Sequence, residues 1–433
     1  MLMIINRDFY LNQLINKMNN SKVKIITGIR RCGKSFLLFN LFYKYLISIN
    51  IPSDQIIKIS LDGYDNRMYR TPTTLNNFIQ SKITNKNKKY YLLIDEIQYC
   101  EPEINEFAPN TEKITFVDVL LSFYNNPNLD VYVTGSNSKM LSTDILTQFR
   151  GRGDEISLNT LSFFEIYDLF ENKDKALKHY MLYGGLPAIY NLKTDEEKQK
   201  YLKNTFNETY IKDILERNSL ISETGEILDT LLNFISSAIG SLTNPLRLAN
   251  RFMSEKNIKI NSTTISKYLN IFKESFLIRS SIRYDVKGNK YFNTPLKYYF
   301  TDIGLRNAKL SFRQYEENHI MENIIYNELY RRDFNIDIGI VEIQQNQNNK
   351  RTRTTLEIDF IASKNHQKYY IQSAYSIWDS QKKEQETRSL NNVNDSFKKI
   401  VVVYEDIIPW HDNNGIYYVG LKEFLLDESI LNN

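Results

Sequence analysis

The stretch from Gly28 to Ser35 constrains the fold of this chain more than any other feature. Two glycines, Gly28 and Gly33, enclose four residues, and Lys34 and Ser35 follow directly. A β-like run, 23–27, precedes the stretch, and an apolar run without Gly or Pro, 36–46, follows it. This order of strand, glycine-rich loop and helix predicts a phosphate-binding loop.

The loop has the groups that a nucleotide phosphate and Mg²⁺ need. The glycines let the backbone bend, so that successive N–H groups at the start of the next helix point toward a phosphate. Lys34 is expected to reach the β- and γ-phosphates, and Ser35 to offer its hydroxyl to Mg²⁺. The candidate nucleotide-binding residues are Gly28, Arg30, Arg31, Cys32, Gly33, Lys34, Ser35 and Phe36.

Further β-like runs follow the loop and alternate with helical connections. They cover residues 55–61, 89–95, 129–134 and 155–158, and a helical pattern over residues 8–18 comes before the first strand. Strands that alternate with helices predict an α/β fold with a parallel sheet covered on both faces. Ligands of such a sheet bind at the carboxyl ends of its strands.

Two adjacent carboxylates, Asp95 and Glu96, come directly after the apolar run 90–94. Asp95 suits a metal-binding position just outside the direct ligands of Mg²⁺, and Glu96 suits orienting and deprotonating the attacking water. The alternative is that the pair caps a helix N-terminus. The phosphate loop upstream favours the catalytic interpretation.

A polar tip follows the run 131–134, at Gly135, Ser136 and Asn137. We expect Asn137 or Ser136 to hydrogen-bond the γ-phosphate or the attacking water. The alternative is a plain Gly-Ser turn.

A basic turn at 149–154 comes before the last strand of this segment, and Arg152 is its better candidate for a role. An arginine here is either a finger that stabilises charge on the phosphoryl group in a neighbouring subunit, which requires an oligomer, or part of a solvated turn. The sequence leaves both interpretations open.

These motifs resemble those of the prokaryotic AAA-type ATPases described as "ATP-binding protein", which carry a second domain of unknown function at the C-terminus. The resemblance rests on residues 27–35, 93–98, 134–141, 151–152 and 161–165. It implies ATP as ligand and a P-loop core with an additional strand, and it matches Lys34, Ser35, Asp95, Glu96 and Asn137 to the family's site positions. The connector 101–115 departs from the family pattern by its length.

The middle of the chain predicts helices and then a winged helix. The segment 183–187 contains two glycines and a proline and marks a lid or a domain boundary. After it, helical patterns cover 196–215 and 226–239. Two further helices, 245–252 and 262–272, precede a β-ribbon formed by 277–284 and by the short runs 290–291 and 297–300. In a winged helix the second helix enters a major groove and the ribbon touches the DNA backbone. The candidate DNA-binding residues are Lys267, Lys273, Arg283 and Lys287. The alternative is that this segment docks on protein.

The C-terminal segment resembles the restriction-endonuclease-like fold in its order of elements. A helix, 318–332, carries Glu322, and strands 336–344, 356–361 and 368–374 follow it. Nucleases of that fold use an Asp and a Glu-x-Lys triplet to hold Mg²⁺ and orient water. Asp359 matches the Asp, with Glu322 or Glu357 in support, but Gln372 and Ala374 replace the two charged residues of the triplet. We therefore expect a degenerate nuclease site at Glu322, Glu357, Asp359 and Gln372.

Length and composition fit several domains. With 433 residues and 42% hydrophobic content, the chain is long enough for about three cores. The predicted divisions are 1–170 for the ATPase core, 171–240 for a helical lid or linker, 241–310 for the winged helix and 311–433 for the endonuclease-like domain. The two cysteines show neither a disulfide framework nor metal-ligand spacing.

The expected protein is a cytoplasmic one without a membrane segment, because no apolar run approaches the roughly 20 residues that span a bilayer. Its net charge of +4 is mild, so any DNA-binding surface is a local patch. The first expectation is an ATPase that uses ATP and Mg²⁺ and acts through its C-terminal half, on DNA. The alternatives are a slow ATP-dependent switch with a protein or DNA partner and, third, an active ATP-dependent nuclease. Homo-oligomerisation stays open.

Overall fold

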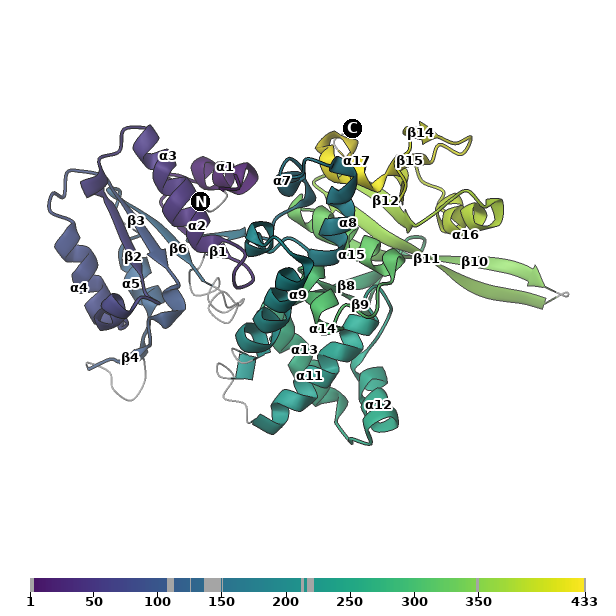
Figure 1. Ribbon diagram of the computed structural model, residues 1–433, viewed down its shortest axis with the longest axis horizontal. Helices are drawn as coiled ribbons and strands as arrows, with labels where there is room; N and C mark the ends of the chain where they lie inside the picture. The colour runs from purple at the N-terminus through teal and green to yellow at the C-terminus, as the bar shows by residue number, and fades with distance from the viewer. Residues whose placement is uncertain are drawn as a thin grey trace. The chain divides into compact units, whose positions relative to one another are not determined.

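The computed structural model of the chain describes residues 4–106, 113–124, 126–135, 149, 151–211, 214–215, 222–347 and 350–431 (Figure 1). It divides into two compact units. Unit 1 consists of Met1–Thr160 with Glu274–Phe276, and unit 2 of Leu161–Lys273 with Leu277–Asn433.

Unit 1 is built on a parallel sheet of five strands in the order β2-β3-β6-β1-β7. Its strands are β1 (Val23–Thr27), β2 (Ile56–Ser60), β3 (Tyr90–Asp95), β6 (Leu129–Thr134) and β7 (Gly153–Ser157), with a small separate pair β4 (Glu103–Ile104) and β5 (Lys113–Ile114). The strand β6 lies between β1 and β3, which is the additional-strand order that the resemblance implied. The predicted parallel α/β core is thus confirmed.

Helices cover the two faces of this sheet. The helices of unit 1 are α1 (Asp8–Asn16), α2 (Lys34–Phe36), α3 (Tyr43–Ser48), α4 (Pro72–Lys82) and α5 (Phe116–Ser122). The π-helical turn η1 (Leu37–Phe42) joins α2 to α3 in one continuous helix. Apolar residues of α4 and α5 pack with Ile25, Leu92 and Val131 in one core. On the other face, the ring of Phe42 in η1 packs against the ring of Tyr132 in β6, with 4.5 Å between the ring centres.

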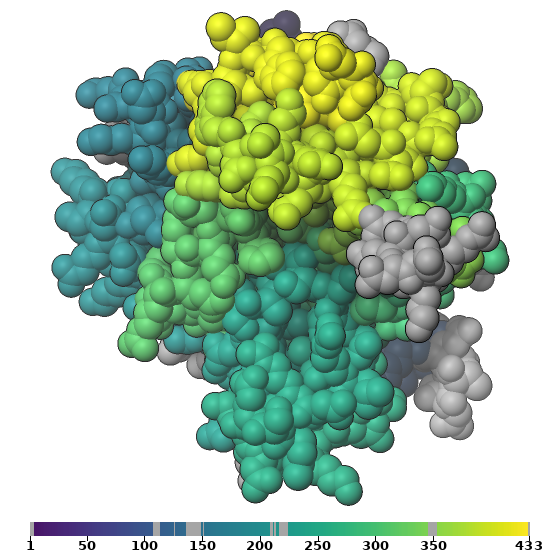
Figure 2. Space-filling view, turned by 90° about the vertical axis from the view of Figure 1, so that its right-hand side faces the viewer, coloured from purple at the N-terminus to yellow at the C-terminus, as the bar shows by residue number. Residues whose placement is uncertain are grey.

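Unit 2 combines a helical segment with a larger mixed sheet. Its helices are α7 (Phe163–Tyr167), α8 (Lys173–Tyr183), α9 (Asp195–Asn204), α11 (Ser222–Ser237), α12 (Pro245–Lys256), α13 (Ser262–Glu274), α14 (Ile303–Lys309), α15 (Glu317–Arg331), α16 (Ser380–Asn391) and α17 (Leu421–Leu426). Its strands are β8 (Ile278–Asp285), β9 (Lys290–Phe300), β10 (Asn335–Gln347), β11 (Lys350–Lys364), β12 (Gln367–Ala374), β13 (Lys398–Val403), β14 (Trp410–His411) and β15 (Tyr417–Gly420). On the face of unit 2 seen in Figure 2, the C-terminal residues and the helices around α12 lie at opposite ends.

The predicted order of helix, helix and β-ribbon is present in α12, α13, β8 and β9. The amphipathic helix α13 buries Ile265, Leu269 and Phe272, as its spacing predicted. The ribbon, however, is not a separate wing. β8 pairs in parallel with β10, so β8 and β9 form one edge of an eight-stranded sheet ordered β14-β15-β13-β12-β11-β10-β8-β9.

This pairing corrects the expected division at residue 310, because strands from both sides of it share one sheet and belong to one compact unit. The unit also begins at residue 161 rather than 171. The sequence pattern gave no sign of the pairing, since a parallel partner of β8 is more than 50 residues away in the chain.

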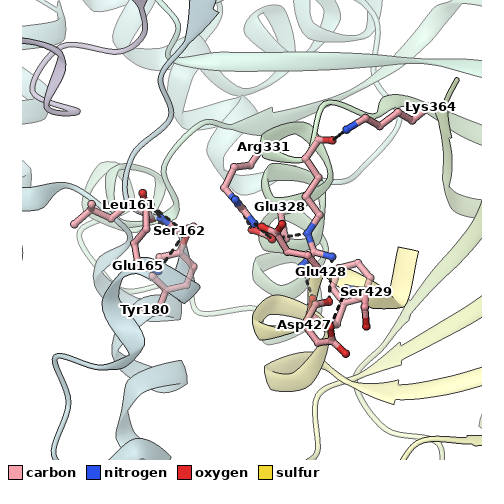
Figure 3. A network of polar contacts seen from close by, with 12 residues as sticks. Leu161, Ser162, Glu165, Tyr180, Glu328, Arg331, Lys364, Asp427, Glu428 and Ser429 are labelled. Carbon is pink, nitrogen blue, oxygen red and sulfur yellow. Dashed lines mark hydrogen bonds and ion pairs between the residues drawn. The ribbon is translucent and has the colours of Figure 1, made fainter. Parts of the chain in front are cut away.

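A buried ionic network ties the end of the chain to α15 (Figure 3). Glu328 accepts hydrogen bonds from Arg331 at 2.7 Å and from Arg332 at 2.7 Å. Arg331 also donates to Glu428, and Arg332 donates to the Phe424 carbonyl at 2.6 Å. The C-terminal helix α17 is therefore held by charged hydrogen bonds as well as by packing. Among the described residues, no helix is both long and apolar enough to cross a membrane.

Candidate functional site

The loop after β1 has the backbone geometry that its sequence predicted. Gly28 has a φ of +143° and Gly33 one of +103°, conformations that residues with a Cβ rarely adopt. A Cβ at Gly28 would also lie 2.2 Å from the Leu158 carbonyl oxygen. Gly28 is thus needed both for the bend and for the close approach of the chain after β7.

The side chain of Lys34 lies inside this loop. It is 3% exposed, and its ammonium donates to the carbonyl oxygens of Gly28 at 3.0 Å and Ile29 at 3.2 Å. Ser35 and Phe36 follow it in the first turn of α2 and are half-buried, as are Arg30 and Gly33, while Cys32 is buried and Arg31 is exposed. The ammonium is therefore held where phosphates would enter the loop.

Arg7 fixes the outer side of the loop, a contact that the sequence analysis missed. Its guanidinium is 3% exposed and donates to the Cys32 carbonyl at 3.0 Å and to the Asn159 carbonyl at 2.8 Å. Arg7 thereby joins the loop to the segment that follows β7. No sequence motif marks it, because an arginine just before a helix is usual on protein surfaces.

Asp95 ends β3 in a buried position with hydrogen-bond partners on both neighbouring strands. It is 3% exposed, and its carboxylate accepts from the Thr134 hydroxyl at 2.6 Å and from the Ser60 hydroxyl at 3.3 Å. The two donors end the strands on either side of β3. The orientation of this carboxylate is therefore set by the sheet itself.

Glu96 comes next, with a left-handed φ of +52°. Its backbone N–H donates to the Thr134 hydroxyl at 2.9 Å, and its carboxylate accepts a hydrogen bond from the Gln98 amide. A non-glycine residue in this conformation is uncommon and is often found at functional sites. The backbone turn separates the carboxylate of Glu96 from the buried Asp95.

Thr134 was not predicted as a site residue, although the sequence contains a signal that could have identified it. It is the one polar residue at the end of an apolar strand, and the strand order places it beside both carboxylates. We expect Thr134→Val to lower kcat for ATP hydrolysis by about tenfold, since a buried hydrogen bond worth roughly 1–3 kcal/mol is lost.

Thr134→Ser keeps the hydroxyl and should restore the rate. Steady-state phosphate release and thermal unfolding would be measured for both variants. A Thr134→Val enzyme with the wild-type kcat would contradict the positioning role.

For two further predicted residues, Asn137 and Arg152, the structure gives no support for a role in this site. Asn137, with Ser136, lies outside the described residues. Arg152 precedes β7, and its guanidinium lies 4.9 Å from the centre of the Tyr124 ring. Because β7 runs parallel to β1, Arg152 is at the end of the sheet opposite to the phosphate loop of its own chain. Its role toward a neighbouring subunit stays a prediction.

The predicted degenerate nuclease residues do come together in unit 2, around a cation that the sequence analysis did not identify. The ammonium of Lys297, on β9, lies 2.9 Å from Glu322, 2.6 Å from Glu357 and 3.6 Å from Asp359. Gln372 adjoins them, accepting from the Asp359 backbone N–H at 3.3 Å. The Lys297 side chain is only 3% exposed.

Burial and charge act in opposite directions in this cluster. Burial alone would lower the pKa of Lys297, but the three carboxylates outweigh it and raise that pKa above its usual value. Burial raises the pKa of Asp359, and the neighbouring Glu322 adds to this effect. For Glu322, burial raises the pKa, but Lys297 together with hydrogen bonds from His319 and Tyr299 outweighs burial and lowers it. The cluster is therefore a lysine enclosed by its counter-ions.

This arrangement bears on the missing catalytic lysine. Ala374 is buried in the core of the sheet, and Lys364, at the end of the neighbouring strand β11, donates to the Arg332 carbonyl at 2.7 Å (Figure 3). Nowhere in the described part of the chain do three or more His, Cys, Asp or Glu side chains form a group that could hold a metal ion. The absence of nuclease activity stays our prediction.

The predicted DNA-binding residues differ in how available they are. Lys267 is exposed on α13, and Lys273 is half-buried on the same helix. Arg283 donates to the Thr294 carbonyl at 2.8 Å, and Lys287 to the Glu342 carbonyl at 3.1 Å. The two ribbon residues thus have partners within the chain, and Lys267 and Lys287 are the exposed residues of the four.

Comparison with known proteins places this site in a family. Residues 20–167 match the model of an AAA domain, and residues 174–316 match that of a domain of unknown function (DUF8612). An uncharacterised protein of Haemophilus influenzae is 31% identical over 433 residues, covering 98% of this chain and 99% of the relative. The uncharacterised protein MJ1544 of Methanocaldococcus jannaschii is 28% identical over 400 residues, covering 88% and 79%.

Solved structures that match this chain include the Walker-type ATPase PABY2304 of Pyrococcus abyssi and the ORC1 protein of Aeropyrum pernix in complex with DNA. The first has a TM-score of 0.44 and 16% identity over 71% of this chain and 96% of that one. The second has a TM-score of 0.31 and 10% identity over 71% and 93%. From its sequence, this chain belongs to the same family as the Haemophilus influenzae protein, and its N-terminal part is an AAA domain of the P-loop ATPase type.

Proposed function

We propose that this protein binds and hydrolyses ATP with Mg²⁺ in unit 1 and uses the nucleotide cycle to control binding of DNA by unit 2. One observation carries the first part. The Lys34 loop and the carboxylates of Asp95 and Glu96 follow the carboxyl ends of β1 and β3, which are separated only by β6. Ligands of parallel sheets bind at this edge.

The residues present fit Mg²⁺ and a triphosphate. The Lys34 ammonium lies inside the loop, 3.0 Å from the Gly28 carbonyl oxygen, and Ser35 and Asp95 have the oxygen ligands that Mg²⁺ prefers. The bound Mg²⁺ would neutralise charge on the phosphates. Asp95 is held by Thr134 and Ser60, so it needs little reorganisation, and Glu96, the residue after β3, would take the proton of the attacking water.

A second candidate is a slow ATP-dependent switch, and one contact favours it. The Gln98 amide donates to the Glu96 carboxylate, so that this carboxylate already has a hydrogen-bond partner within the chain. In this version, ATP binding changes the partner affinity of unit 2, and hydrolysis only resets the state.

DNA is the proposed partner because α13 has an exposed lysine, Lys267, on the open face of a helix whose other face is buried. Homo-oligomerisation is also proposed, with Arg152 acting on the nucleotide of a neighbouring subunit. A protein partner is the alternative for unit 2.

Phosphate release from ATP and Mg²⁺ tests these proposals, with and without duplex DNA, for the wild type and Gln98→Leu. Turnover that DNA accelerates supports the coupled ATPase. Slow turnover that DNA leaves unchanged but Gln98→Leu raises supports the switch. A protein that fails to bind ATP would rule out both. A rate per subunit that is independent of protein concentration, from a demonstrated monomer, would remove the role of Arg152.

A further inference from the structure

A third carboxylate, that of Asp62, lies at the edge of the unit 1 sheet where Asp95 and Glu96 are found. β2 pairs in parallel with β3, and Ser60 at the end of β2 is the register partner of Asp95. Asp62 follows Ser60 closely in the chain and is exposed to solvent. Its carboxylate is therefore at the edge where the ligands of a parallel sheet bind.

Hydrogen bonds hold the backbone around Asp62 in place. The N–H of Leu61 donates to the Asp95 carbonyl at 3.0 Å, which continues the pairing of β2 with β3 beyond the end of the strand. The Arg70 guanidinium donates to the Leu61 carbonyl at 2.6 Å and to the Asp62 carbonyl at 3.0 Å. The segment that carries Asp62 is thus a fixed part of this edge.

The Ser60 hydroxyl lies between two carboxylates. Its oxygen is 2.5 Å from Oδ1 of Asp62 and 3.3 Å from Oδ2 of Asp95. A serine hydroxyl has one hydrogen to donate, and O–H···O bonds are usually 2.5–3.0 Å long. The shorter contact therefore takes the larger share of this hydrogen. Oδ2 of Asp95 keeps most of its capacity to accept, while Oδ1 of the same carboxylate accepts from the Thr134 hydroxyl at 2.6 Å.

We infer that Asp62 is a positioning residue for the Mg²⁺ of the bound nucleotide. By holding the Ser60 hydrogen, it keeps Oδ2 of Asp95 available to the metal or to a water bound to the metal. Without the Asp62 carboxylate, the hydroxyl turns to Asp95, because a charged acceptor forms the stronger hydrogen bond. This inference rests on the proposed function of unit 1 and adds to it a residue that follows a different strand.

The test measures how strongly Mg²⁺ raises the affinity for a nucleotide that is not hydrolysed. The full chain is titrated calorimetrically with a non-hydrolysable ATP analogue, first in EDTA and then at a series of Mg²⁺ concentrations. The variants are Asp62→Asn, Ser60→Ala and the two combined. Asp65→Asn, which removes another exposed carboxylate of the same segment, is the matched control. Wild-type affinity in EDTA and an equal thermal unfolding midpoint show that each variant is folded.

We expect Asp62→Asn to need about three- to tenfold more Mg²⁺ for half of the effect on affinity, which is the size of one hydrogen bond. Ser60→Ala should need nearly the wild-type concentration, because no hydroxyl then competes for Oδ2 of Asp95. In the combined variant the effect of Asp62→Asn should disappear, since the two residues act through one hydroxyl. Asp65→Asn should behave like the wild type.

An Asp62→Asn protein with the wild-type Mg²⁺ dependence would overturn the inference and leave the proposed Mg²⁺ site intact. An effect of Asp62→Asn that persists beside Ser60→Ala would also overturn it, because Asp62 would then act through its charge alone. If the wild type binds no analogue, or if Mg²⁺ does not change its affinity, the proposed function fails together with the inference.

Discussion

Lys34→Ala is expected to abolish measurable ATP binding. The variant removes the one ammonium that the structure places inside the phosphate loop, where it lies within 3.0 Å of the Gly28 carbonyl. Hydrogen bonds to charged groups contribute about 1.5–3 kcal/mol each, so the loss of two phosphate contacts weakens binding by roughly a hundredfold or more. Isothermal titration with ATP and Mg²⁺ measures it. Lys44→Ala, an exposed lysine of the same helix, is the matched control and should bind normally.

Glu96→Gln should give the complementary result, with ATP bound at nearly wild-type affinity and hydrolysis lower by about 10²–10⁴. The amide keeps the shape of the side chain but cannot take a proton from water. Glu101→Gln, at an exposed carboxylate nearby, serves as its control. Equal phosphate release by the wild type and Glu96→Gln would remove Glu96 from the mechanism.

The second large effect is expected in unit 2, where Lys297→Met should destabilise the fold by about 3–5 kcal/mol. The substitution keeps the length of the side chain but leaves Glu322, Glu357 and Asp359 without their shared cation, and removing one partner of a buried ionic cluster has a cost of this size. Lys422→Met breaks a more exposed pair with Asp406 and should change stability by less than about 1 kcal/mol. Denaturant unfolding of the three proteins gives the comparison.

The pH dependence of this loss has a definite sign. Without the ammonium, burial holds the pKa of the two buried carboxyls, Glu322 and Asp359, above their unfolded values of about 4, as it already does for Asp359 in the wild type. Such groups contribute stability that is fully present below the unfolded pKa and lost as pH rises through the folded pKa. The difference between Lys297→Met and the wild type should therefore be larger at pH 8 than at pH 5. A difference that stays constant over this range would show that the carboxylates are not the cause.

The sequence predicted local features well. The loop from Gly28 to Ser35 and the apolar strand ending in Asp95 are contiguous patterns, and the structure has both with nearly the expected bounds. Thr134, Arg7 and Lys297 were missed for one common reason. Each acts on residues that are distant in sequence, Lys297 across 25 residues to Glu322 and Arg7 across 152 to Asn159.

The domain boundary predicted at residue 310 and the missed role of Lys297 have the same cause, which is a strand pairing that the sequence does not reveal. A basic residue in an alternating strand such as β9 is typical of a solvated surface, and only the sheet order reveals that Lys297 faces inward. Alternation predicts that a strand has two unlike faces, but it does not predict which strand lies beside it.

The parallel pairing of β8 with β10 limits where this protein can be divided, both in recombination between relatives and in truncated fragments. The match to the domain of unknown function ends at residue 316, between two strands that hydrogen-bond to each other, so that sequence module is not a module of the fold. A fragment that stops there would leave the inner edge of β8 unpaired, and an unpaired strand edge promotes self-association. The segment that ends at residue 316 and the strands from β10 onward therefore form one structural unit. Exchanging one of them between relatives requires exchanging the other as well.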